Sequence, residues 1–220
     1  MKNCKAPKNQ ITRRILLSAC ATALAVACMV ALPQPAHADD ITPPPVPDNI
    51  QVPAGNEAFL VGHAVGTQNY VCRPSGTGVK FVLFTPQATL FDDADQQVTT
   101  HFFSPNPFEA NTDSTVVGDH IIRATWQDSQ DTSTVWAKAI ESSSDPSFVA
   151  PGAIPWVLLQ VVGAQDGPTH GDTLTPTTFI QRLNTYGGVA PSTGCTSRKD
   201  VGNQAFVPYT ADYFFYKSAD

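Results

Sequence analysis

The sequence lacks the short motifs that mark the commonest enzyme classes. It contains no Gly-x-Ser-x-Gly nucleophile elbow, no His-Glu-x-x-His zinc motif, no Cys-x-x-Cys pair and no phosphate-binding P-loop. Gly76 and Gly78 form a Gly-x-Gly pair, but Val79 follows directly and no β-α-β pattern surrounds it. We therefore expect no nicotinamide or nucleotide enzyme, and no cofactor is predicted. These absences weigh against an enzyme without excluding one.

Basic residues are scarce beyond the N-terminal segment. The chain has 13 Lys and Arg against 19 Asp and Glu, and five of the basic residues fall within residues 1–38. Residues 39–220 thus carry eight basic and 19 acidic side chains, a formal net charge of −11. Because such an acidic chain repels phosphate backbones and anionic lipid, we expect it to bind neither nucleic acid nor a membrane surface.

Only one long apolar run is present, and it lies near the N-terminus. Ile15–Leu32 follows a basic stretch and precedes the small-residue sequence Ala36-His37-Ala38. This order predicts an export signal over residues 1–38 that is cleaved after the last alanine. An uncleaved signal anchor is the alternative, since the run could just span a bilayer. After cleavage we expect no membrane span and a periplasmic or extracellular location.

Two further features of this segment leave the export route open. Arg13 and Arg14 fit a twin-arginine signal, but an ordinary secretory signal can carry the same pair. Cys28 is a candidate for lipidation, although more apolar sequence follows it.

Only two of the five cysteines lie outside the predicted signal, Cys72 and Cys195. Two cysteines in an oxidising compartment most simply form one disulfide, and a pair of buried thiols is the alternative. In the chain-entropy account a bond closing so long a loop is worth about 4.7 kcal/mol. It would also tie the early part of the domain to the late part.

The remaining sequence predicts a single, mainly β domain over residues 54–220, preceded by a proline-rich leader over residues 39–53. The leader favours an extended conformation and could be a spacer or a strap on the domain surface. Beyond it, about ten short runs rich in β-branched and aromatic residues alternate with turn residues, one turn containing Gly66. We expect an antiparallel β-sandwich or flattened barrel with little helix.

The segment from His101 to Asp113 is the first candidate site, predicted as a long loop. It combines an imidazole with the carboxylates of Glu109 and Asp113 and the aromatic ring of Phe108. With His120 these groups could bind a metal, although no metal is our leading expectation. The other interpretation is a structural loop held by Asx turns and prolines.

Arg182 is the second candidate, because it stands in an apolar strand of a chain with few basic residues. A half-buried arginine needs a carboxylate partner. The candidate partners are Glu109, Asp113 and Asp212. Alternatively the guanidinium anchors a ligand carboxylate or sugar hydroxyls, with Asn184 beside it. Phe108 and Tyr186 could then stack on a sugar ring.

Several segments together carry a family resemblance. They are Gln68–Cys72, Pro86–Leu90, Ile154–Leu159, Ile180–Gly188 with Cys195, and Tyr209–Tyr216. In combination they resemble an exported bacterial and fungal family known as domain of unknown function 3455. The resemblance covers nearly everything after the leader, and it implies an exported single domain with no established activity. This chain departs from the family pattern at Phe108, where tryptophan is usual, and at Ser114, which lacks the usual preceding glycine.

We therefore expect an exported, non-catalytic β domain that binds a small molecule, a glycan or a cell-surface component. One alternative is a metal- or cofactor-dependent exported enzyme that uses the loop of residues 101–113. The other is a structural envelope protein. The sequence does not fix the oligomeric state. The candidate ligand-binding residues are His101, Phe108, Glu109, Asp113, Arg182 and Asn184.

Overall fold

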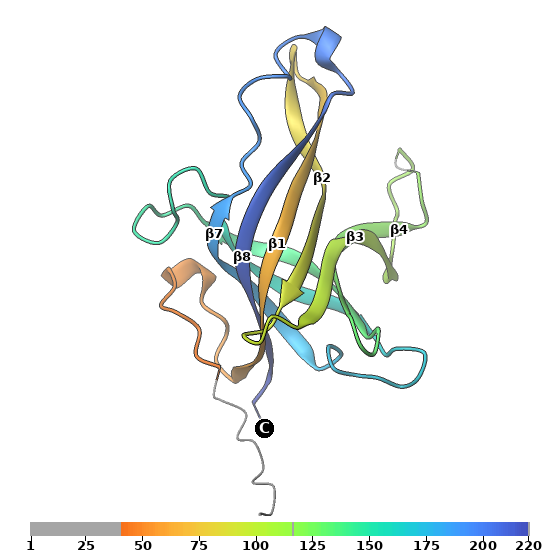
Figure 1. Ribbon diagram of the computed structural model, residues 1–220. Helices are drawn as coiled ribbons and strands as arrows, with labels where there is room; N and C mark the ends of the chain where they lie inside the picture. Colours follow the sequence, from red (N-terminus) through yellow and green to blue (C-terminus); the bar gives the residue numbers. More distant parts are fainter. Residues whose placement is uncertain (1–40, 116, 220) are drawn as a thin grey trace, which may run out of the picture. The chain divides into compact units, whose positions relative to one another are not determined.

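The described part of the chain is an antiparallel β-barrel (Figure 1). The computed structural model describes residues 41–115 and 117–219, so the predicted export signal lies outside the described residues. Each strand pairs with the next, and the last pairs with the first. The strands are β1 (Asn56–Ser75), β2 (Gly78–Phe91), β3 (Gln97–Ala110), β4 (His120–Asp128), β5 (Thr134–Ser143), β6 (Trp156–Gln165), β7 (Thr177–Gly187) and β8 (Gln204–Ser218).

The prediction of a mainly antiparallel β domain is confirmed, and the sheet closes on itself instead of forming two packed sheets. Two short 3-10 turns, η1 (Asp48–Ile50) and η2 (Arg198–Asp200), are the helical elements of the described residues. None of the helices described is long and apolar enough to cross a membrane.

The strands are fewer and longer than the turn residues of the sequence suggested. β1 runs straight through Gly66, which we had placed in a turn. A Cβ at this position would lie 2.1 Å from the carbonyl oxygen of Gln87 in β2. The glycine therefore permits a close approach of two strands and does not reverse the chain. β2 likewise continues through Pro86, which stands opposite Gln68 of β1.

Side-chain alternation divides the apolar residues of β6, β7 and β8 between two clusters. One cluster fills the barrel and includes Trp126, Ile180, Tyr213 and Phe215. The other lies on the outer face of these strands and includes Trp156, Leu158, Leu183 and Phe214. Because Arg182 stands between Leu183 and an outward-facing Gln181, its side chain belongs to the inner face.

The proline-rich leader covers the outer cluster. In residues 41–52, Ile50 is fully buried, and Ile41, Val46 and Val52 pack against the same cluster. The side-chain amide of Gln181 donates a hydrogen bond to the carbonyl oxygen of Ile50 at 2.6 Å. The leader is thus a strap on the outside of the barrel. It covers the outer face of β7 and does not contact the inner face, which lines the barrel interior.

The predicted disulfide is present between Cys72 of β1 and Cys195 of the β7–β8 connection, with a Cα–Cα distance of 5.4 Å. The backbone of Cys72 also bonds to Gly202 and Asn203. Since β1 pairs with β8 along almost its whole length, the early and late strands are neighbours, as expected.

Candidate functional site

A pocket of about 350 Å³ lies inside the barrel, and each of the eight strands contributes at least one lining residue. Its walls are mostly apolar. The larger apolar side chains are those of Leu83, Phe103, Ile122, Trp126, Val157 and Leu159. Ile122 and Ala139 are exposed, so the pocket reaches the surface on the side of β4 and β5. Eight-stranded barrels are wide enough to hold one small ligand in this way.

His101 of β3 lies on the pocket wall, 4% exposed, with its ring stacked on Trp126 at a centroid distance of 4.1 Å. Its Nδ1 bonds to the carbonyl oxygen of Thr125 at 2.9 Å, so Nδ1 carries the proton and Nε2 keeps a lone pair. Burial lowers the pKa of His101 to about 3, and the positive charge of Arg182 acts in the same direction. His101 is therefore neutral at ordinary pH.

Arg182 of β7 reaches the same pocket without a carboxylate partner among the described residues. Its Nη2 donates to the carbonyl oxygen of Pro155 at 2.9 Å, and its Nε has no hydrogen-bond partner. The expected ion pair is therefore wrong. Each expected partner is engaged elsewhere: Glu109 with Arg123, Asp113 in a surface turn, and Asp212 with His63 and Asn184.

Three buried hydrogen-bond donors on the pocket wall have no partner in the part of the chain that the structure describes: Nε2 of Gln68, Nε1 of Trp126 and Nε of Arg182. Gln68 and Trp126 are at most 1% exposed. An unsatisfied buried donor costs about 1–3 kcal/mol, and such groups are rare enough in native proteins to require an explanation. The Tyr209 hydroxyl, which contacts the Tyr213 hydroxyl at 3.2 Å, is the polar side-chain group that lies close to Gln68.

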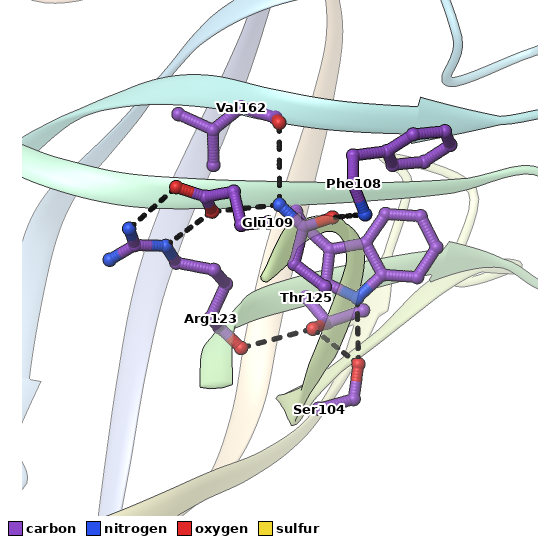
Figure 2. Close-up of polar contacts among 8 residues, drawn as sticks. Ser104, Phe108, Glu109, Arg123, Thr125 and Val162 are labelled. Atoms are coloured by element: carbon purple, nitrogen blue, oxygen red, sulfur yellow. Dashed lines mark hydrogen bonds and ion pairs between the residues drawn. The ribbon is translucent and has the colours of Figure 1, made fainter. Parts of the chain in front are cut away.

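The charges around the pocket are of one sign. Arg123, Lys138 and Arg182 line it, three of the eight basic residues beyond residue 38, and no Asp or Glu of residues 41–115 or 117–219 does. Glu109 neutralises Arg123 by accepting hydrogen bonds from Nε and Nη2, both at 2.7 Å (Figure 2). This contact lowers the pKa of Glu109 to about 2. The pocket therefore keeps a positive excess in an otherwise acidic chain.

The segment predicted as a long loop is mostly strand. β3 extends to Ala110, and its pairing with β4 is interrupted between Pro105 and Ala110. Asn106 in this bulge is fully buried, donates to Glu109 at 2.8 Å and to the carbonyl oxygen of Val162 at 3.3 Å, and accepts from the Phe108 amide (Figure 2). These bonds fix the bulge across β6, so the carboxylate of Glu109 is held against Arg123.

The other predicted site residues do not join the pocket. Phe108 is 57% exposed and packs edge-on against Trp136, outside the lining. Asp113 is exposed and accepts hydrogen bonds from Thr115 in its turn. Asn184 donates to Asp212 on the surface. Within the described residues, no three His, Cys, Asp or Glu side chains come together as a metal site, so the set that included His120 is not assembled.

The structure thus brings His101 and Arg182 together and adds four residues that the sequence interpretation had not selected: Gln68, Trp126, Lys138 and Tyr213. Trp126 was detectable in part. It is spaced two and four residues from Ala124 and Ile122 in β4, so the three side chains share one face of the strand, which is the pocket wall. Gln68 stood out only as part of the family segment Gln68–Cys72, and its place on the pocket wall depends on strands far away in the sequence.

Comparison with models of protein families places the chain in a family. The family model described as "Protein of unknown function (DUF3455)" matches residues 53–217. No curated protein and no solved structure matches the chain.

Proposed function

This chain belongs to the DUF3455 family of proteins of unknown function, and we propose that its barrel binds a small, largely apolar molecule. The observation that carries the proposal is the interior pocket with its three unpartnered donors. A volume of about 350 Å³ lies within the range of ligand pockets, which combine apolar walls with a few directed polar groups. A closed barrel holds those groups rigidly, because every strand is paired on both sides.

Two features favour binding over catalysis. An efficient general base has a pKa near the working pH, whereas burial lowers that of His101 to about 3. The other titratable side chains on the wall are cations and a buried tyrosine, and burial raises the pKa of that tyrosine, Tyr213.

We place the protein outside the cytoplasm because a basic and apolar N-terminal segment precedes a domain with one disulfide.

The test uses the neutral fluorescent probe N-phenylnaphthylamine, whose emission rises in an apolar site. Ala139 is exposed at the rim, so Ala139→Trp should block the pocket without disturbing the core. Ala110→Trp, at an exposed alanine of β3 outside the lining, is the matched control. We expect saturable binding to the unmodified protein and the control, and at least a roughly tenfold loss in Ala139→Trp. Equal binding by both variants, or none by the unmodified protein, would refute the proposal.

A further inference from the structure

The two arginines on the pocket wall differ in one respect. Arg123 uses Nε and Nη2 to hold the carboxylate of Glu109, and Figure 2 shows this paired contact. The Nε of Arg182 has no partner, and its other contacts are to neutral groups, the carbonyl oxygen of Pro155 and the hydroxyl of Tyr213. A guanidinium prefers a planar partner with two oxygens, and an uncompensated charge in a partly buried position is costly. Among the described residues, Arg123 has such a partner and Arg182 does not.

The surroundings of Arg182 select the same kind of partner. Lys138 also lines the pocket, although its charge acts on Glu109 as well, and among the described residues no carboxylate lines the wall to repel an anion. Trp126 and Gln68 each offer one more unpartnered N–H, and an oxygen acceptor would satisfy either of them. The nearest imidazole, His101, is neutral and adds no charge of its own. The polar part of the site therefore suits a single small anion.

The apolar part of the wall sets the rest of the ligand. Phe103, Ile122, Val157 and Leu159 line the pocket, and its volume of about 350 Å³ is near the lower end for ligand sites. A polyanion such as a nucleotide would leave most of its charge against apolar walls, which is unfavourable. A ligand with a medium-length alkyl chain or an aromatic ring would pack against these apolar walls.

Resting on the proposed function, we propose that the ligand is an apolar monocarboxylate whose carboxylate binds the Arg182 guanidinium inside the barrel. The carboxylate takes the position on Arg182 that Glu109 takes on Arg123. The ligand's hydrocarbon part lies along the wall formed by β4, β5 and β6.

The test compares an acid with its amide of the same size. Decanoate and decanamide are titrated as competitors of bound N-phenylnaphthylamine, so that only the charged head group differs. We expect decanoate to bind the unmodified protein at least about tenfold more tightly than decanamide, as one charge-assisted pair warrants. In Arg182→Met the affinities for decanoate and decanamide should differ by no more than about twofold. Arg198→Met, at an exposed arginine of η2, should keep the full ratio.

A second measurement does not depend on any variant at pocket residues. The indole N–H groups of Trp126 and Trp156 both lack partners, but only Trp126 lines the pocket. In ¹H–¹⁵N spectra of the unmodified protein, decanoate should shift the Trp126 indole signal and leave that of Trp156 in place.

The outcomes separate the two proposals. Equal affinities for acid and amide, or a preference that survives in Arg182→Met, would overturn the carboxylate assignment while probe binding still supports an apolar pocket. If Arg182→Met does not fold, an unmoved Trp126 signal in the unmodified protein overturns the assignment by itself. Failure of the neutral probe and of both competitors to bind would overturn the assignment and the proposed function together.

Discussion

Arg182 carries a positive charge into the barrel wall, and its partners among the described residues are neutral: the carbonyl oxygen of Pro155 and the hydroxyl of Tyr213. The chain as a whole has 19 acidic residues. Every carboxylate that the sequence offered as its partner is bound elsewhere, and Glu109 serves Arg123. Removing an unpaired, partly buried charge often stabilises a protein when an apolar side chain of similar size replaces it. A residue kept at such a cost is typical of a binding site.

Arg182→Met should therefore raise the thermal midpoint of the ligand-free protein, even though it removes anion binding. We expect a rise of about 2–4 °C, which corresponds to about 1 kcal/mol in a domain of this size. Calorimetry of the unmodified protein, Arg182→Met and the surface control Arg198→Met would measure it, and the control should stay within about a degree. A fall in the midpoint of Arg182→Met would mean that the guanidinium supports the fold.

The Arg123–Glu109 pair gives the protein a defined response to acid. The pKa of Glu109 is lowered from 4.5 to about 2 by Arg123, and the side-chain amide of Asn106 acts in the same direction. A lowered pKa in the folded state means that the stabilisation is complete above about pH 4.5 and is lost as the pH falls toward 2.

Glu109→Gln should consequently lower the free energy of unfolding by about 1–2 kcal/mol at pH 7, allowing for partial exposure of the pair. The difference from the unmodified protein should shrink between pH 4.5 and pH 2. Urea denaturation at several pH values measures it. A difference that does not change with pH over this interval would show that packing, and not the ion pair, is responsible.

At the scale of single elements, glycine decides how closely β1 and β2 approach. Gly66 and Gly78 both lie at β1–β2 pairing positions, and neither has a positive φ. A Cβ at Gly66 would lie 2.1 Å from the Gln87 carbonyl oxygen, whereas at Gly78 the nearest atom is 3.9 Å away. Because the obstruction at Gly66 is backbone, no side-chain rotation relieves it.

Gly66→Ala should destabilise the barrel by about 1–3 kcal/mol, and Gly78→Ala by much less. Thermal unfolding of the two variants beside the unmodified protein tests this comparison directly. Equal losses would indicate that the intrinsic strand preference of glycine, and not the close approach, governs both positions.

The strands differ in how well their residues could be predicted from the sequence. Side-chain alternation in residues 119–127 and 132–140 predicts two strands, and the continuous apolar run of residues 154–162 predicts a third. β4, β5 and β6 occupy these segments, with their ends displaced by one to three residues. Gly66 looked like a turn residue because local composition does not reveal which strand lies opposite. Residues 101–113 looked like a loop for the same reason: their prolines interrupt pairing with β4 only between Pro105 and Ala110. The bulge is held by the buried Asn106, through contacts with β6 that no local pattern encodes.

At the scale of the whole molecule, closure of the barrel makes the pocket. The family resemblance and the disulfide were both predictable, and both are confirmed. The convergence of His101 with Arg182 was not predictable, because it requires eight strands to pair in one register around a common interior. The sequence identified these two residues as unusual, and only the closed sheet places them on one wall.

The disulfide ties β1 to the β7–β8 connection, and neither cysteine lines the pocket. Replacing both cysteines by serine should lower the free energy of unfolding by roughly 2–5 kcal/mol. Affinity for N-phenylnaphthylamine, measured well below the lowered thermal midpoint, should remain within about twofold of the unmodified protein. A folded double variant that no longer binds the probe would show that the disulfide shapes the binding site as well as stabilising the barrel.

The most direct measurement is a crystal structure of the unmodified protein grown with decanoate. We expect density inside the barrel, with the carboxylate within hydrogen-bond distance of the Arg182 guanidinium and the alkyl chain along Trp126 and Val157. An empty barrel at saturating decanoate, or a decanoate whose carboxylate points away from Arg182, would contradict it.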